Sequence, residues 1–289
     1  MTFKTIALAI ALLSLAAPTH ARADEGGWKL VWSDEFEGDR LDDTKWTHAA
    51  DCGGGGNDER QCYVVSPDTV SVGGGVLKLT AIKRKTRGLA NPWAGPTGPM
   101  KTGDYASGKI LTKGKASWLY GRIEARARVP GGQGVWPAIW MMPEHETYGG
   151  WPRSGEIDTL ETVNLGAPCE PCEGGRENRI FGTIHFADAA GGHGQKSGHT
   201  APAPTADGFH VYAVEWSPEA IVWSADGQAY ARAEAADWSA DGASRPFDQP
   251  FHLILNLAFG GAWPEGANAK GVDDAALPAV FEIDWVRVS

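Results

Sequence analysis

Three carboxylates lie within the six residues 156–161, inside an otherwise strand-like segment. Glu156 and Asp158 are two residues apart, so an undistorted strand places them on the same face. Glu161 follows Asp158 by three residues and would point to the opposite face. A β-bulge near Leu160 would return Glu161 to the face of the other two, and bulges are common beside active sites. The spacing therefore predicts a cluster of three acids on one side of a bulged strand.

Such a cluster suits the hydrolysis of a glycosidic bond. With one residue absorbed by the bulge, the two glutamates would be about 13 Å apart at Cα. If both side chains lean inward, the carboxyls approach the separation of about 5–5.5 Å that retaining glycosidases use. Asp158 lies between them and would split their pKa values, so that one glutamate is ionised and the other protonated. The alternative is an acidic strand face in water, where most charged residues lie.

Thirteen tryptophans favour the active-site interpretation. Tryptophan offers a flat apolar face and one N–H donor, which suits the C–H face and the hydroxyl groups of a sugar. Trp136 and Trp140 flank a proline, Trp151 precedes the carboxylates, and Trp263 lies in a glycine-rich turn. For at least half of the thirteen, packing in the core is the simpler interpretation.

The elements that must position these residues are short strands. Between Tyr120 and Val129, charged and apolar residues alternate, which is typical of a half-buried strand. Residues 86–104 and 187–208 are rich in glycine and proline and are expected to be loops. Helix is expected only as isolated turns, because no long segment shows a period of 3.6. The same alternation predicts further strands at 29–33, 76–82, 107–112, 135–142, 155–163, 179–186, 210–216, 220–225, 228–234, 251–257 and 280–288.

These strands, separated by 38 glycines and 18 prolines, predict an all-β fold, an antiparallel β-sandwich of jelly-roll type. Residues 1–23 have a charged start, an apolar run and a small-residue cleavage site, as in a secretory signal peptide. The apolar run is too short to span a bilayer. We therefore expect a secreted protein, extracellular or periplasmic, with a single catalytic domain at 24–289 and no membrane partner.

The charge of the chain excludes some partners. The formal net charge is −10, and loss of Lys4 and Arg22 with the signal peptide takes it to −12. A chain this acidic is not expected to bind nucleic acid or an anionic membrane surface, so a neutral partner fits better. We expect the protein to act as a monomer.

The four cysteines form two local pairs. Cys52 and Cys62 are ten residues apart, and Cys169 and Cys172 three. In an oxidising compartment, two disulfides are expected, although four cysteines allow three connectivities. A zinc site is the alternative, but the second pair is not followed by histidines at finger spacing.

The sequence resembles glycoside hydrolase family 16, in particular its bulged branch of laminarinase-type endo-β-1,3-glucanases. The family signature Glu-x-Asp-x-x-Glu is matched by Glu156, Asp158 and Glu161. The resemblance implies that Glu156 is the nucleophile, Glu161 the general acid/base, and Asp158 the residue that supports both. It also implies a concanavalin A-like jelly roll with a substrate cleft across the concave sheet. Further matching segments lie at 32–38, 120–122, 134–140, 255–261 and 283–288.

The resemblance also implies ligand-binding residues. Lys109 stands where laminarinases often have arginine. No cofactor is expected for catalysis, but many relatives hold a structural calcium, which here would be bound by Glu35, a backbone carbonyl near Gly75, and Asp284. Oxygen donors of this kind suit a hard cation. The implied substrate-binding residues are Asn57, Lys109, Trp136, Trp140, His185 and Trp263.

The sequence thus predicts a retaining endo-glycosidase that cuts internal β-1,3 or mixed β-1,3-1,4 linkages of a β-glucan polysaccharide by double displacement. A lectin-like carbohydrate-binding module is one alternative, because fold does not fix function. Such a module has no need of two glutamates and a bulge. A transglycosylase or a galactan (agar-type) hydrolase of the same family is the other. The sequence lacks a distinctly basic signature, which argues against a sulfated galactan.

Overall fold

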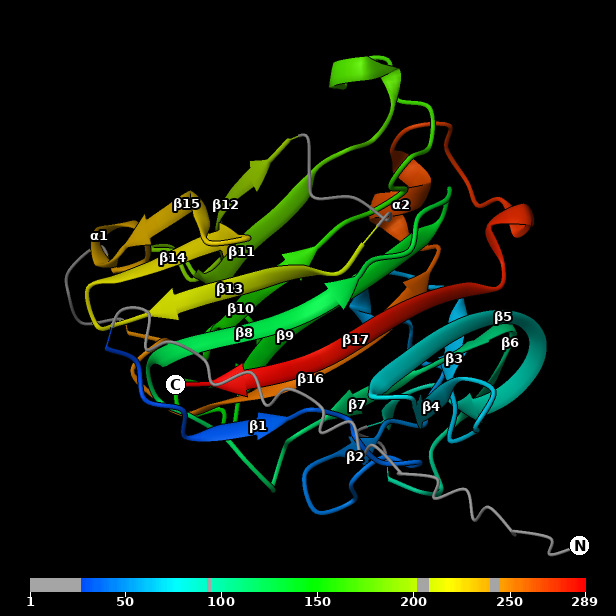
Figure 1. Ribbon diagram of the computed structural model, residues 1–289, viewed down its shortest axis with the longest axis horizontal. Helices are drawn as coiled ribbons and strands as arrows, with labels where there is room; N and C mark the ends of the chain where they lie inside the picture. Colours follow the sequence, from blue (N-terminus) through cyan, green and yellow to red (C-terminus); the bar gives the residue numbers. More distant parts are fainter. Residues whose placement is uncertain (1–26, 93–94, 202–207, 240–244) are drawn as a thin grey trace, which may run out of the picture.

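The computed structural model describes residues 27–92, 95–201, 208–239 and 245–289. The predicted signal peptide at 1–23 lies outside these residues. Two large β-sheets pack against each other, with short connections around them (Figure 1). The predicted all-β sandwich is confirmed. In the described part of the chain, no helix is long and apolar enough to cross a membrane.

The larger sheet has ten strands. Its hydrogen-bonded order is β15-β14-β13-β8-β17-β5-β6-β3, with β1 beside β17 and β4 beside β5. Neighbouring strands run antiparallel except β3 and β6, which are parallel. The strands are β1 (Trp32–Asp34), β3 (Gln61–Tyr63), β4 (Val70–Gly73), β5 (Val76–Leu89), β6 (Met100–Ser107), β8 (Gly121–Arg128), β13 (His210–Trp216), β14 (Ala220–Ala225), β15 (Gln228–Glu234) and β17 (Ala279–Val288).

The smaller sheet has seven antiparallel strands in the order β12-β11-β10-β9-β16-β7-β2. The strand with the three carboxylates, β10, lies near the middle of this sheet. Two short helices, α1 (Ala235–Trp238) and α2 (Ala262–Gly266), agree with the prediction of isolated helical turns. The strands are β2 (Thr47–His48), β7 (Lys109–Leu111), β9 (Val135–Pro143), β10 (Glu156–Glu161), β11 (Ile180–Ala187), β12 (His193–Thr200) and β16 (Phe251–Phe259).

The core lies between the two sheets because alternate strand residues point inward. On β8, the predicted half-buried strand, Ile123, Ala125 and Ala127 are fully buried. On β10, Ile157 and Leu160 are fully buried on the inner face, while the carboxylates use the other one. Burial of apolar area stabilises the fold by roughly 25 cal/mol per Å². The inward residues of β10 therefore hold the strand with the three carboxylates in place.

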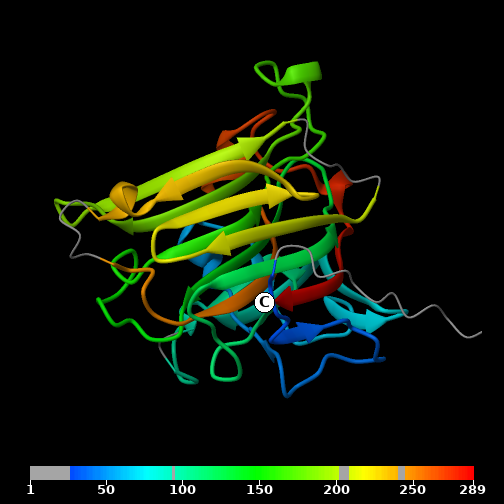
Figure 2. The same cartoon turned by 60° about the vertical axis from the view of Figure 1, so that its left-hand side comes forward.

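The two segments predicted to be loops are partly strands, so that prediction was wrong. β5 continues to Leu89 and pairs with β6, which begins at Met100. β12 pairs with β11 along its whole length, and in Figure 2 it runs along β15 of the other sheet. The glycines that suggested a loop are packing requirements. A Cβ at Gly198 would lie only 2.5 Å from Ala231, and one at Gly194 only 2.8 Å from Phe186.

Candidate active site

A single register shift places the three carboxylates of β10 on one face. Against β9, Asp158 pairs with Trp140 and Leu160 pairs with Ile139, so Thr159 is the extra residue. The predicted bulge is therefore confirmed. Against β11, the partners fall on alternate residues of a regular strand: Glu156 lies opposite His185, Asp158 opposite Thr183 and Glu161 opposite Phe181.

The bulge is anchored from the opposite sheet. Trp223, on β14, reaches across and donates its indole N–H to the backbone carbonyl of Asp158 at 2.7 Å. The ring fits because residue 182 on β11 is glycine, where a Cβ would lie 2.2 Å from Trp223 Cδ1. A carbonyl that the bulge takes out of the regular ladder thus finds a buried donor, as buried backbone groups require.

Glu156 and Asp158 lie close together beside His185. One ligand atom from each of these three residues fits in a group in which all atoms lie within 4.8 Å of one another. Trp151 donates its indole N–H to Glu156 Oε2 at 2.6 Å. His185 Nε2 lies 3.2 Å from Asp158 Oδ2, and the Asp158 side chain is almost fully buried. His185, predicted from the resemblance, is therefore next to the acids.

Glu161 is surrounded by aromatic side chains. Trp136 donates its indole N–H to Glu161 Oε1 at 3.0 Å. Trp263, on α2, packs edge-on against Trp136 with ring centroids 5.3 Å apart. It packs at the same distance against Phe181, a residue that sequence reasoning did not select. The structure thus brings the predicted residues Trp136 and Trp263 together at this end of the site.

Burial raises the pKa of all three carboxyls, that of Glu156 to about 8, that of Asp158 to about 7 and that of Glu161 well above its usual range. Repulsion from Asp158 adds to the increase at both glutamates. Water reaches part of each glutamate side chain, which limits the penalty there. At Glu156, His185 and the Trp151 indole oppose the increase, whereas Trp136 does so at Glu161. Glu156 therefore has more groups that favour its ionised form.

Lys109 and Trp140 lie above a polar network at the β7–β16 side of the site. The Lys109 ammonium lies 5.0 Å from the centroid of the Trp140 ring and 5.4 Å from that of Tyr63. Trp140 donates to Asn256 Oδ1 at 2.6 Å, and Asn256 donates to the Tyr63 hydroxyl at 3.1 Å. Burial lowers the pKa of Lys109, and the charge of Glu59 opposes this. Asn256 was missed, although it is an amide inside the apolar run of β16.

Asn57 is the predicted substrate residue whose local structure differs most from expectation. In the sequence, Asn57, Glu59, Gln61 and Tyr63 alternate as they would on one face of a strand, but β3 begins only at Gln61. Asn57 ends a short 3-10 turn, is exposed, and donates to the Gly55 carbonyl at 3.3 Å. Its own carbonyl accepts from Ala262 N at 2.7 Å, which places it beside the start of α2. The glycines before Asn57 favour a turn over an extended strand.

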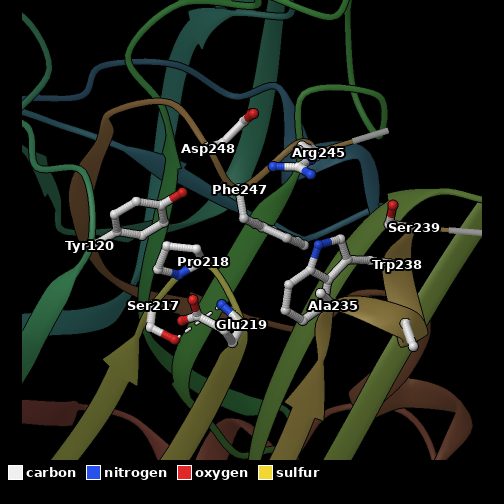
Figure 3. A pocket seen from close by; sticks show the side chains of 11 residues that line it. Tyr120, Ser217, Pro218, Glu219, Ala235, Trp238, Ser239, Arg245, Phe247 and Asp248 are labelled. Atoms are coloured by element: carbon white, nitrogen blue, oxygen red, sulfur yellow. Dashed lines mark hydrogen bonds between the residues drawn. The ribbon is translucent and has the colours of Figure 1, made fainter. Parts of the chain in front are cut away.

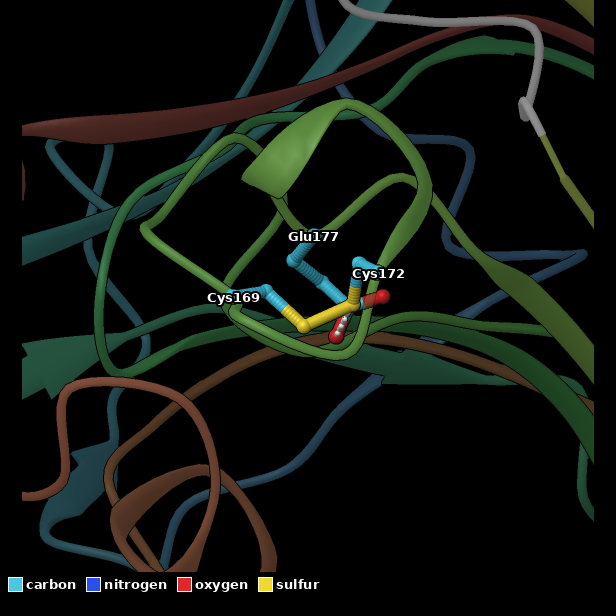
Figure 4. A group of neighbouring side chains, drawn as sticks. All are labelled: Cys169, Cys172 and Glu177. Atoms are coloured by element: carbon cyan, nitrogen blue, oxygen red, sulfur yellow. Dashed lines mark hydrogen bonds between the residues drawn. A yellow bond between two sulfur atoms is a disulfide. The ribbon is translucent and has the colours of Figure 1, made fainter.

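Both local cysteine pairs form disulfides, Cys52 with Cys62 and Cys169 with Cys172, as predicted. Figure 4 shows the second pair beside Glu177, whose carboxylate lies 3.6 Å from Cys172 Sγ. Zinc binds cysteine as the thiolate, and a disulfide has none. The zinc alternative is therefore wrong for these cysteines.

The residues implied for calcium do not fit that ion as they are arranged. Both oxygens of Glu35 accept from Arg287, at 2.9 and 2.7 Å. Asp284 forms an ion pair with Arg126. Gly75 lies in the turn between β4 and β5 with a positive φ of 77°. Each carboxylate thus already has a cationic partner, and calcium stays a prediction from the resemblance alone.

One cavity lies away from these residues. It has a volume of about 360 Å³ and lies between α1 and the β13–β14 turn (Figure 3). Tyr120, Trp238 and Phe247 give it aromatic walls, and Glu219 and Asp248 add carboxylates. Trp238 and Phe247 are themselves buried in the core. None of the residues predicted to carry the chemistry lines this cavity.

Comparison with known proteins adds an independent result. Residues 58–287 match the model of the glycosyl hydrolases family 16. A beta-glucanase from Rhodothermus marinus is 42% identical over 269 residues, which are 90% of this chain and 85% of that protein. A glucan endo-1,3-beta-glucosidase from Niallia circulans is 36% identical over 96% of this chain and 39% of that protein. The X-ray structure of the laminarinase from Rhodothermus marinus superposes with a TM-score of 0.75 at 40% identity, covering 90% of this chain and 96% of that one.

Proposed function

This chain belongs to glycosyl hydrolase family 16 and is a glycoside hydrolase, and we propose that it cuts internal β-1,3 or mixed β-1,3-1,4 linkages of a β-glucan. The observation that carries the proposal is the bulge at Thr159, which turns Glu156, Asp158 and Glu161 to one face. The printed names of the relatives support the choice of β-glucan.

In the proposed mechanism, the Glu156 carboxylate attacks the anomeric carbon while Glu161 gives its proton to the departing glycosidic oxygen. The new C–O bond to Glu156 forms as the glycosidic C–O bond breaks. Glu161, now ionised, then takes a proton from water as that water attacks the same carbon and releases Glu156. Two inversions leave the configuration of the sugar unchanged.

The neighbours of the acids support these roles. The Trp151 indole N–H at Glu156 stabilises a carboxylate, as the nucleophile requires. Glu161 lies among Trp136, Trp263 and Phe181, where apolar rings favour the protonated acid. On the β7 side, Trp140 would offer its ring face to the C–H face of a sugar, with the Lys109 ammonium close to that ring.

The test is the release of reducing ends from laminarin, mixed-linkage β-glucan and agar by the wild type and by Glu156→Ala. We expect wild-type activity on laminarin or mixed-linkage glucan, none on agar, and a loss of at least about 10⁴-fold in the variant. Glu146→Ala, at an exposed glutamate before β10, is the matched control and should keep full activity. Equal activity of wild type and Glu156→Ala would refute the proposal. If only agar were cleaved, the substrate would be a galactan and not a β-glucan.

Product analysis separates hydrolysis from its two alternatives. A hydrolase yields products shorter than its substrate, whereas a transglycosylase also yields longer ones, because a sugar in place of water takes the glycosyl group. A binding module migrates more slowly in a gel that contains laminarin than in a gel without it, but it releases no reducing ends. We expect only shorter products.

We also propose that the protein is exported and works as a monomer. The motive is the signal-like pattern at 1–23 and the acidic net charge of the remainder. N-terminal sequencing of the protein recovered from the periplasm or the medium should begin at Asp24. Gel filtration should give the mass of one chain. An N-terminus that retains Met1, or a dimer mass, would contradict the respective part.

A further inference from the structure

A second histidine extends the active site toward the solvent. His193 is the first residue of β12, the edge strand in a segment whose glycine content suggested a loop. Its Nε2 lies 2.7 Å from Nδ1 of His185. His185 Nε2 in turn lies 3.2 Å from Asp158 Oδ2. The two imidazoles therefore form a chain from the nearly fully buried carboxyl group of Asp158 to the exposed ring of His193 at the edge of the sheet.

The position of His193 is defined by packing as well as by this contact. The two imidazole rings are stacked, with centroids 5.0 Å apart and planes 24° from parallel. Trp151 packs against both rings, at 4.7 Å from His193 and 6.0 Å from His185. The same indole donates to Glu156. His193 thus belongs to a cluster that touches both Glu156 and Asp158 through one intermediate residue each.

Only one of the two facing nitrogens carries a hydrogen when both imidazoles are neutral. If His193 donates from Nε2, then His185 accepts at Nδ1 and carries its hydrogen on Nε2, facing Asp158. If His193 accepts, His185 Nε2 presents a lone pair to Asp158. The hydrogen bond at one ring nitrogen thus decides the state of the other.

We propose that His193 is a positioning residue that donates to His185 and so fixes His185 in the tautomer with its hydrogen on Nε2. Asp158 Oδ2 then lies 3.2 Å from the ring nitrogen that carries the hydrogen, so a proton on this oxygen is disfavoured. A proton that Asp158 and Glu156 share must then lie between the two acids, on Glu156 or on the other Asp158 oxygen. In that place it offsets the repulsion between the two carboxylates. In the opposite tautomer, Asp158 would donate to His185, and Glu156 would face a bare oxygen.

The charged groups around the pair are consistent with neutral imidazoles. Burial lowers the pKa of both His185 and His193, opposed by Glu156 at the first ring and Asp188 at the second. Asp158 faces His185 from β10. Lys109, on β7, influences Glu156 from the other side of the site, and its own charge is favoured by that glutamate.

The inference rests on the proposed roles of Glu156 and Asp158, and its main test needs no substrate. Nitrogen-15 spectra of the histidine side chains report which ring nitrogen carries hydrogen. In the wild type at neutral pH, we expect His185 to carry it on Nε2. In His193→Leu, which has no donor, this preference should be lost. In His193→Gln, whose amide N–H reaches a similar place, it should be kept.

Kinetics give the second readout. His193→Leu should lower kcat about tenfold while KM on the polysaccharide changes by less than about twofold. The acidic limb of its kcat profile should move to higher pH by about half a unit or more, because Glu156 holds its proton longer. His193→Gln should recover most of kcat and of the profile. Lys196→Gln, on the same strand but paired with Asp237 on the opposite face, is the control and should behave as the wild type.

The inference is overturned if His185 carries its hydrogen on Nδ1 in the wild type, or if His193→Leu leaves both the tautomer and the pH profile unchanged. Equal melting temperatures of the two His193 variants exclude a general loss of structure. If no polysaccharide is cleaved, the proposed function fails, whereas the tautomer measurement still decides the role of His193.

Discussion

Glu156 and Glu161 are chemically identical side chains that differ in their neighbours. Glu156 accepts a hydrogen bond from Trp151 and lies beside Asp158 and His185. Glu161 accepts from Trp136 within a cluster of aromatic rings. Burial raises the pKa of both glutamates, but more neighbours of Glu156 favour its ionised form. This difference assigns the nucleophile to Glu156 and the proton donor to Glu161.

Rescue by azide tests this assignment directly. In Glu161→Ala, with an aryl β-glucoside or laminaribioside that needs no protonation of its leaving group, the glycosyl enzyme forms and azide can resolve it. The expected product is the β-glycosyl azide. In Glu156→Ala, azide takes the place of the missing carboxylate and gives the α-glycosyl azide. NMR of the anomeric proton distinguishes the two products. The same anomer from both variants, or the reverse pattern, would contradict the assignment.

Removing the charge of Glu161 should stabilise the fold. Its pKa is raised in the folded protein, so the stability it contributes is complete below the unfolded pKa and is lost as pH rises through the folded value. Glutamine does not ionise, so Glu161→Gln does not lose stability in this way as the pH rises. Each pKa unit corresponds to about 1.4 kcal/mol, reduced here because water reaches part of the side chain.

Calorimetry is the measurement for this prediction. At about pH 8 we expect the melting temperature of Glu161→Gln to exceed that of the wild type by about 2–5 °C, and at about pH 3.5 the two should agree. An equal gain at both pH values would mean that the effect is not electrostatic. A lower melting temperature at pH 8 would contradict the prediction outright.

At the scale of the element, β10 depends on Trp223 and Gly182. Gly182→Ala places a methyl group 2.2 Å from the present position of the indole, so the ring must move and release the Asp158 carbonyl. Overpacking of this kind costs about 1–3 kcal/mol. We expect a lower melting temperature and at least about tenfold lower activity. Gly73→Ala is the control, because a Cβ there meets nothing within 4 Å.

Trp223→Phe separates packing from hydrogen bonding. Phenylalanine keeps an aromatic ring but has no N–H, so the Asp158 carbonyl loses its donor at a cost of about 1–3 kcal/mol. Activity should fall by about tenfold, because a small displacement of Asp158 disturbs both glutamates. The variant should remain folded by circular dichroism. Unchanged activity would show that the bulge keeps its shape without the indole.

The sequence predicted the bulge because a spacing of two and then three residues has only one simple explanation on a strand. It did not predict β12, since glycines at 194 and 198 look like loop residues when the packing partners Phe186 and Ala231 are unknown. His193 lies on that strand and was therefore not predicted as a site residue. Trp136, Trp140, His185 and Trp263 came from the family resemblance rather than from periodicity.

The other contacts that the sequence did not predict join residues that are far apart along the chain. Phe181 pairs with Glu161 across two strands that are joined by a long connection. The Trp223–Asp158 hydrogen bond spans 65 residues and two sheets. Local patterns carry no information about such contacts. Asn256 is the exception, because a single amide in the apolar strand 251–259 is a visible signal of a buried polar contact.

At the scale of the whole molecule, the larger sheet already has balanced charges where the resemblance implied calcium. Arg287 pairs with Glu35, and Arg126 pairs with Asp284. We therefore expect the melting temperature in excess EDTA to agree within about 1 °C with that in millimolar calcium, since a ligand stabilises only by binding the folded state. An increase of several degrees with calcium, abolished in Asp284→Asn, would show that the ion displaces the arginines.

The indole of Trp223 reaches the catalytic strand from the other layer of the sandwich, so separation of the two layers by heat would remove the donor that holds the Asp158 carbonyl. Heat inactivation and loss of the fold should then coincide in a single event. The stability of the interface between the two sheets should therefore set the highest temperature at which the enzyme is active. Mutations that improve packing at this interface, away from the substrate, should raise that temperature.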